Sequence, residues 1–185
     1  IFRDMFHSIL YPHGYVPRDN LDVKSDVLDW TGDHPHTNFK ASFQLMVDAG
    51  FHVEMLTLPY TCFDASHYGT LLLIDLEDEF HPDEVSKLTA DVKQRGLSLV
   101  VMADWYNVDV MKKVKFLDDS TREMWTPITG GSNLPALNTL LSSFGIGVGD
   151  KIFSGSVQLA GFTVQLASST SITEFPAGGT LYYGS

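Results

Sequence analysis

Residues 70–103 read TLLLIDLEDEFHPDEVSKLTADVKQRGLSLVVMA and indicate the fold most directly. They hold two short apolar runs, Thr70–Leu76 and Leu97–Ala103, on either side of a segment with helical periodicity. The apolar residues at helical spacing in that segment are Val85, Leu88 and Val92. The second run has apolar residues on both faces of the predicted strand. This pattern is typical of strands buried on both faces of a parallel sheet. The stretch therefore predicts strand, helix and strand.

Residues that typically begin or end helices extend this prediction in both directions along the chain. Pro82 or Asp83 is placed to begin the central helix, and Gly96 to end it. Another helix precedes it, capped by Thr37 or Asn38 and ended by Gly50, and a strand of alternating residues follows at 51–58. The apolar face of this earlier helix is formed by Phe39, Phe43, Leu45 and Met46. The order fits an α/β fold with a doubly wound, mostly parallel sheet and right-handed crossovers, of flavodoxin-like type.

The carboxyl-terminal part predicts a short helix near Val108–Lys113, a loop to Asn133, and a helix that has Pro135 in its first turn and ends at Gly145. Rapid alternation between strand-like runs and Gly or Ser turns follows. The runs are Lys151–Phe153, Ser156–Leu159, Phe162–Ala167 and Ser171–Phe175. They predict a small antiparallel addition on the edge of the sheet.

The segment Tyr11–Phe39 has no sustained period and is dense in Pro, Gly, Asp, His and aromatic residues. Long irregular segments of compact domains usually wrap a surface or carry function. We therefore divide the chain into a wrapping amino-terminal arm at 1–37, an α/β domain at 38–150, and antiparallel strands at 151–185 packed on the same domain.

Composition excludes several classes of function. The chain of 185 residues has a formal net charge of −11, which disfavours nucleic acid and anionic membranes as ligands. Its longest apolar runs are far shorter than the ~20 residues of a membrane-spanning helix. The chain opens without a signal peptide, as an internal segment of a longer protein would. Acidic residues around 75–84 do not have the spacing of a calcium-binding loop and indicate a solvated helix amino terminus.

Several unusual sequence motifs of this chain occur, in the same order, in one protein family. They are YPHGYVPRDNLDVKSDVLDWTGDHPHTNF, CFDASHYGTLL, SLVVMADWYN, MKKVKF and WTPITGGSNLPALNTLL. Through them the chain resembles the region downstream of the catalytic domain in the site-1 protease family, nearest to its plant-type members. This family contains subtilisin-like serine endopeptidases. The resemblance implies a membrane-anchored parent in the lumen of the Golgi or endoplasmic reticulum that processes membrane-bound transcription-factor precursors.

The resemblance also implies a role without catalysis. A subtilisin-type triad needs a serine in a Gly-Thr-Ser word, and this sequence has none, so no triad residue is carried over. The element order also resembles class I glutamine-amidotransferase-like domains, whose active members place a cysteine after the strand corresponding to Leu97–Ala103. Here Asp104, Trp105, Tyr106 and Asn107 follow, without a nucleophile. We predict an inactive segment, without a cofactor, whose partner is the catalytic domain of its own chain and possible protein substrates or regulators.

Two constellations suggest other chemistry. Cys62 is the only cysteine and lies near His67, but free cysteines are commonly buried and inert, so a structural role is favoured. The resemblance adds pairing with a cysteine outside the segment as an alternative. Asp33, His34 and His36 form a weak candidate for a metal site, because the two histidines have no clear third protein ligand beside them. The alternative functions are therefore a stand-alone amidotransferase-like or metal-dependent hydrolase, or a small-molecule-binding doubly wound module.

Two loops after predicted parallel strands are rich in aromatic residues. They carry Tyr60, Phe63 and Tyr68 in one loop, and Trp105, Tyr106 and Trp125 in the other. Loops at the carboxyl ends of parallel strands gather at one edge of a sheet. We therefore predict a continuous aromatic surface for the catalytic domain or a bound protein. The rival hypothesis is that these rings complete the core.

Overall fold

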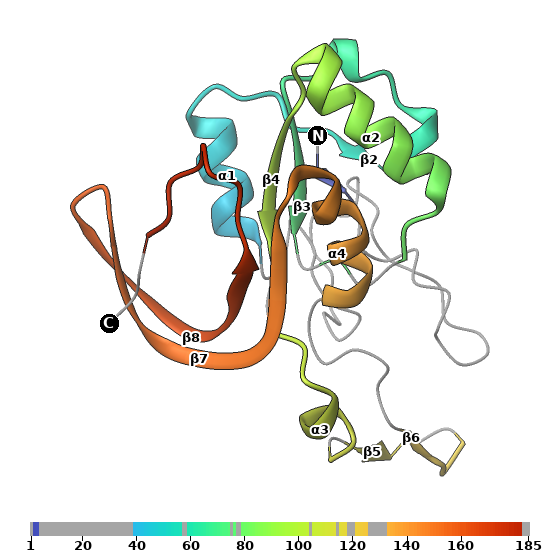
Figure 1. Cartoon of the computed structure of the whole chain (residues 1–185), viewed down its shortest axis with the longest axis vertical. Coiled ribbons are helices and arrows are strands. Elements are labelled where there is room, and N and C mark those ends of the chain that lie inside the picture. Colours follow the sequence, from blue (N-terminus) through green and yellow to red (C-terminus); the bar gives the residue numbers. More distant parts are fainter. Residues whose placement is uncertain are drawn as a thin grey trace. The chain divides into compact units, whose positions relative to one another are not determined.

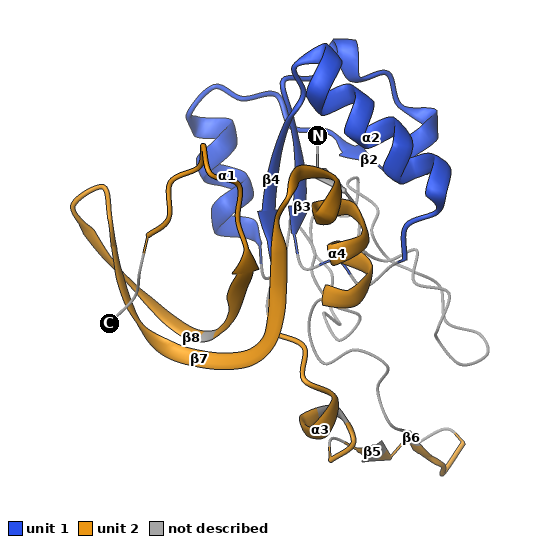
Figure 2. Ribbon diagram, viewed as in Figure 1, with its two compact units in different colours: residues 1–102 blue, residues 103–185 orange. Residues whose placement is uncertain are grey.

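The computed structural model divides into two compact units, residues 1–102 and residues 103–185 (Figure 2). It describes residues 2–3, 39–56, 59–74, 76, 79–103, 105–113, 115–117, 121–125 and 133–182. Most of the predicted amino-terminal arm lies outside these residues. None of the helices in the described ranges combines the length and apolar composition that a bilayer span requires.

The first unit is built on a parallel sheet of four strands (Figure 1). The strands are β1 (Phe2–Arg3), β2 (Met55–Leu56), β3 (Thr70–Ile74) and β4 (Ser98–Met102). Their order across the sheet is β2-β1-β3-β4, and every pair is parallel. This confirms an α/β architecture with a parallel sheet. The strand order is compatible with the doubly wound type, which stays a prediction.

β1 comes from the beginning of the predicted arm and lies inside the sheet. Phe2 is in register with Met55 of β2 on one side and with Leu72 of β3 on the other. The first residues of the chain therefore contribute an inner strand, which periodicity in two residues does not reveal. The strand predicted at 51–58 is shorter, since only Met55 and Leu56 of the described residues pair.

α1 (Lys40–Asp48) begins after Phe39, which occupies the N-cap position without a side-chain cap. The predicted caps at 37 and 38 lie outside the described residues. Its end is as expected, because Gly50 adopts φ +88 and donates to the Val47 carbonyl. Phe51 donates to the Met46 carbonyl, which completes a Schellman motif.

α2 (Pro82–Arg95) confirms the helix predicted between the two apolar strands. Gly96 ends it in the left-handed region at φ +78. Leu88 is fully buried, as are Leu71 and Leu73 of β3. The registers Leu71 with Leu99 and Leu73 with Val101 place these strand residues on one face of the sheet. This face is the core of the first unit.

The expectation that the β4 strand is buried on both faces is wrong. Val100 is 36% exposed and Met102 is 54% exposed. β4 is the last strand of the sheet order and pairs only with β3 among the described strands. An edge strand is buried on both faces only where other elements cover both of them, and the face that carries Val100 and Met102 is open.

The second unit begins with α3 (Val108–Met111), which confirms the short helix predicted near Val108–Lys113. A short antiparallel pair, β5 (Phe116–Leu117) and β6 (Met124–Trp125), lies where only a loop was expected. α4 (Leu134–Leu141) continues as the 3-10 helix η3 (Ser142–Phe144), and Gly145 ends it at φ +71. The helix predicted from Pro135 to Gly145 is confirmed.

The tail forms one long antiparallel hairpin, β7 (Gly147–Leu159) and β8 (Phe162–Glu174). The antiparallel pairing is confirmed, but the four predicted runs are merged into two strands. These strands form a sheet of their own among the described strands, so the predicted addition to the edge of the parallel sheet is not observed. Ala160 and Gly161 connect them at φ +50 and +85, which matches a two-residue type I′ turn.

Candidate functional site

The aromatic segment 59–69 follows β2 and is held against α2 along its length. It contains two 3-10 turns, η1 (Tyr60–Cys62) and η2 (Ala65–His67). The Tyr60 amide donates to Glu84 Oε1 at 3.0 Å, and the His81 amide donates to Glu84 Oε2 at 3.0 Å. Glu84 is only 6% exposed, so one buried carboxylate joins this segment to the first turn of α2. The prediction of a solvated acidic helix terminus is therefore wrong for Glu84.

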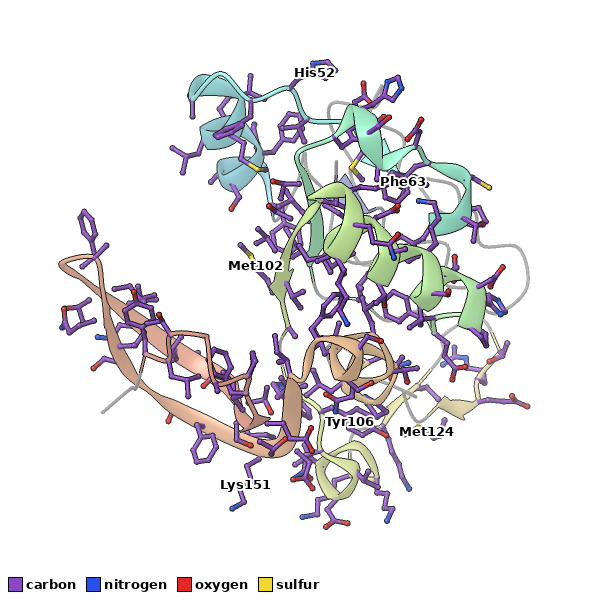
Figure 3. The ribbon with its side chains drawn as sticks, turned by 45° about the horizontal axis from the view of Figure 1, so that its top comes forward. His52, Phe63, Met102, Tyr106, Met124 and Lys151 are labelled. Atoms are coloured by element: carbon purple, nitrogen blue, oxygen red, sulfur yellow. The ribbon has the colours of Figure 1, made fainter. Side chains whose placement is uncertain are left out.

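Ring contacts reinforce this attachment. Tyr60 stacks on Phe80 with ring centroids 5.4 Å apart. Phe63 contacts Tyr68 edge to face at 6.0 Å, and the Lys87 ammonium lies 4.0 Å from the Phe63 ring centroid. Figure 3 shows Phe63 where the segment meets α2. An ammonium over an aromatic face is attracted by the ring quadrupole, so Lys87 binds the segment as well as its own helix.

Asp91 is a buried charge on the same helix and is 1% exposed. Lys87 Nζ donates to its Oδ2 at 2.5 Å, and Arg95 Nη1 lies 3.3 Å from its Oδ1. Both partners are four residues away along α2, which is the helical spacing for side-chain pairs. A buried carboxylate requires such pairing, so this trio is a structural ion cluster between the helix and the Phe63 ring.

A second polar cluster lies where the segment ends. The Tyr68 hydroxyl donates to Glu54 Oε2 at 2.5 Å, and His52 Nε2 lies 3.0 Å from Glu54 Oε1. The Tyr68 hydrogen bond, followed by that of His52, lowers the pKa of Glu54. The same hydrogen bond raises the pKa of Tyr68. The cluster is largely exposed and joins Tyr68 to Glu54, the residue directly before β2.

The three predicted interface residues of this segment differ in burial. Tyr60 is 3% exposed and Phe63 is 7% exposed, whereas Tyr68 is half-buried. The rings of Tyr60 and Phe63 thus take part in the packing of the first unit, as the rival core hypothesis expects. Contact of this segment with a partner stays a prediction.

The other predicted loop lies in the second unit. Trp105 and Tyr106 are half-buried, and Trp125 lies in β6. Asn107 caps α3, since its Oδ1 accepts from the amides of Asp109 and Val110. Because the two loops belong to different units, their adjacency also stays a prediction.

Asn107 also bears on the comparison with a nucleophile elbow. Its φ is −143, an extended conformation, whereas a nucleophile elbow places its residue on a strained turn. Its Nδ2 donates to the Asp150 carbonyl at 2.9 Å, which ties α3 to β7. Among the described residues that follow β4, Asn107 therefore acts as a helix cap and as a tether between α3 and β7.

The alternative catalytic and metal candidates have these positions. Cys62 is exposed, so the expectation of a buried thiol is wrong, while pairing outside the segment stays a prediction. Its sulfur lies 4.0 Å from Thr61 Oγ1, and the His67 ring lies 3.7 Å from Asp64. The residues Asp33, His34 and His36 lie outside the described part of the chain. Within the described part, no group of three His, Cys, Asp or Glu residues is arranged to hold a metal ion.

Several exposed apolar side chains in and after α1 and in β4 were not predicted as a site. α1 has no buried residue, and Leu45 is 70% exposed and Val47 42% exposed. Phe51, directly after α1, is 67% exposed. Figure 3 shows Met102 on the side of β4 away from α2. Exposed apolar side chains of this kind are suited to contact with another protein surface and not to catalysis.

Sequence reasoning missed three polar residues that organise the molecule. Glu84 had a detectable signal, because a glutamate three residues after an N-cap is half of a capping box. Asp91 had its basic partners at helical spacing. Asn138 had no signal: its Oδ1 accepts from the Val148 amide and its Nδ2 donates to the Val148 carbonyl, each at 2.9 Å.

The parallel sheet with its crossover helix and the separate antiparallel hairpin define a mixed α/β domain. A family model described as "MBTPS1, fourth GATase-like domain" matches residues 1–185, and the chain belongs to this family. It is 57% identical over 182 residues to "Subtilisin-like protease SBT6.1" of Arabidopsis thaliana, covering 98% of this chain and 18% of that protein.

The chain is also similar to animal proteins. It is 52% identical over 181 residues to "Membrane-bound transcription factor site-1 protease" of Homo sapiens, covering 98% of this chain and 17% of that protein. The Mus musculus protein of the same name gives the same identity and coverage. The resemblance to the site-1 protease family is thereby confirmed. The chain spans less than a fifth of the length of these curated relatives.

Proposed function

We propose that this chain is a noncatalytic domain of a site-1-protease-like serine endopeptidase. Its role is to pack on the subtilisin domain of the same polypeptide, to stabilise it, and to help position substrates or partner proteins. The parent protein would process membrane-bound transcription-factor precursors in the lumen of the Golgi or endoplasmic reticulum. The names of the relatives and the 98% coverage of this chain support the proposal.

The observation that carries the packing role is the open face of the first unit. In parallel sheets both faces are normally covered. Here Leu72 is in register with Val100, and Ile74 with Met102, so all four side chains share the second face. Exposure on this face rises from Ile74, at 5%, to Met102, at 54%. An uncovered edge of this kind, beside a helix without buried residues, is suited to contact with another domain.

The test uses the full-length parent with charged substitutions at exposed apolar positions, one on α1 and one on that face of β4. Leu45→Asp and Met102→Asp are compared with Gln94→Asp, which adds the same charge at an exposed polar position of α2. We expect at least a fivefold loss of peptide cleavage and a lower melting temperature for the first two variants only. Activity and melting temperature equal to those of Gln94→Asp would contradict the packing role.

The proposal also requires that residues 1–185 have no hydrolytic activity of their own. Purified segment is assayed with peptide and glutamine substrates, beside its Cys62→Ala and His67→Ala variants. Turnover that disappears in either variant would support the hydrolase alternative and overturn the noncatalytic assignment.

A further inference from the structure

The hairpin β7–β8 has one apolar face and one polar face near its turn. Residues directly opposite each other in an antiparallel pair point to the same side. On one side the opposed pairs are Leu159 with Phe162, Val157 with Val164, and Gly155 with Leu166. On the other side they are Gln158 with Thr163, and Ser156 with Gln165. Two-residue alternation of this kind is typical of a ribbon that lays one face on another surface.

The apolar side is incompletely covered. Phe162 is 73% exposed and Val164 is 38% exposed, whereas Val157 is 8% exposed. The hairpin itself therefore covers only a small part of Phe162. Covering the Phe162 side chain would remove apolar surface from water, which is favourable.

Charge is absent from the same region. The 22 residues from Ile152 to Thr173 contain no Asp, Glu, Lys or Arg, although the chain as a whole is 19% charged. Solvent-exposed ribbon edges usually carry charged residues, lysine above all, which prevent pairing with other chains. Depletion of charge together with exposed aromatic residues is instead the composition of the central part of protein interfaces.

The hairpin is held at its base and projects from there. Asn138 of α4 makes two hydrogen bonds to Val148, and Asn107 donates to the Asp150 carbonyl. From residue 150 to the turn, the strand extends on the order of 30 Å at ~3.4 Å per residue. Figure 1 shows this long curved ribbon leading away from α4 to its turn. A ribbon of two strands is marginally stable in water by itself, so a surface that supports the distal half is expected.

We infer that the apolar face formed by Val157, Leu159, Phe162, Val164 and Leu166 docks on a part of the same parent polypeptide outside residues 1–185. This inference rests on the proposed function and adds the hairpin as a specific contact. The occupant follows from size and charge. The curated relatives extend far beyond the matched region, since this chain covers only 17–18% of their length, so most of the parent lies outside residues 1–185. A face without basic residues does not recruit nucleic acid or anionic lipid.

The experiment places a photoreactive benzoylphenylalanine at position 162 of the full-length parent and, as the matched control, at position 163. Thr163 is also exposed but belongs to the polar side of the ribbon. After irradiation at low protein concentration, crosslinked peptides of the monomer are identified by mass spectrometry. We expect position 162 to crosslink to peptides outside residues 1–185 with at least five times the yield of position 163.

A second measurement compares Phe162→Asp with Thr163→Asp in limited proteolysis of the full-length parent. Cleavage within residues 158–166 should be at least five times faster for Phe162→Asp, and Phe162→Leu should restore protection. Equal crosslinking at the two positions, crosslinks confined to residues 1–185, or crosslinks to a second protein or to lipid would each overturn the inference. So would equal proteolysis of the two aspartate variants. The proposed function would survive these results if the α1 and β4 variants still impair the parent.

Discussion

Replacing Glu84 with alanine should release the aromatic segment 59–69 from α2. The carboxylate accepts two amide hydrogen bonds, from Tyr60 in that segment and from His81 before the helix. The Tyr60 hydrogen bond is buried, and the His81 one is partly buried. Without the carboxylate, the Tyr60 amide faces a site that water enters poorly, while the His81 amide is more easily hydrated.

The magnitude follows from this difference. A hydrogen bond to a charged group contributes about 1.5–3 kcal/mol, and a buried donor left without its acceptor costs about 1–3 kcal/mol. Counting the Tyr60 bond in full and the His81 bond in part, Glu84→Ala should lower the free energy of unfolding by about 2–4 kcal/mol. A loss of ~3 kcal/mol corresponds to a fall in melting temperature of roughly 6–12 °C for a chain of this size. Glu84→Gln keeps one acceptor oxygen and should lose about half as much.

Urea and thermal unfolding of the two Glu84 variants, with Glu79→Ala as the control, measure this effect. Glu79 is exposed, so its removal changes the net charge equally without touching the segment. Hydrogen exchange gives the local readout, because the Tyr60 amide should exchange faster in Glu84→Ala and remain protected in Glu79→Ala. If Glu84→Ala unfolds like Glu79→Ala and the Tyr60 amide keeps its protection, the assignment of Glu84 as the anchor is wrong.

Two further predictions concern a titrating pair and a turn. Glu54 has a lowered pKa in the folded chain, so its stabilising contribution is present above its ordinary pKa and is lost as the pH falls through the folded value. Tyr68→Phe should move the pKa of Glu54 back toward its ordinary value in a carboxyl NMR titration, and an unchanged titration would exclude the hydroxyl as the main cause. The raised pKa of Tyr68 acts on the alkaline side, where stability persists below its ordinary pKa of about 10 and is lost as the pH rises through the folded value. In the hairpin, Ala160 has φ +50, a region that asparagine or glycine adopts at less cost, so Ala160→Asn should stabilise the turn by about 0.5–1 kcal/mol. Denaturant unfolding followed by a probe in the hairpin tests this, and a destabilised Ala160→Asn variant would exclude a type I′ turn.

How much of the candidate site the sequence predicted depends on the kind of residue. Aromatic composition singled out Tyr60 and Phe63, and both take part in specific contacts. It does not distinguish a core ring from an interface ring, since burial of apolar surface favours both equally. Glu84 was hidden in an acidic run that looked solvated, because the partner that buries it, the Tyr60 amide, lies far away in the sequence.

The helix ends, the strand–helix–strand order and the family could all be inferred from the amino-acid sequence. Gly50, Gly96 and Gly145 end helices through a local backbone conformation, which a few neighbouring residues decide. The tertiary structure alone decided that Phe2 and Arg3 form an inner strand, that β4 is an edge with an open face, and that the tail is one hairpin. These features depend on pairing between distant segments and on what covers each face. Because such contacts are made by residues far apart in the chain, local periodicity does not encode them.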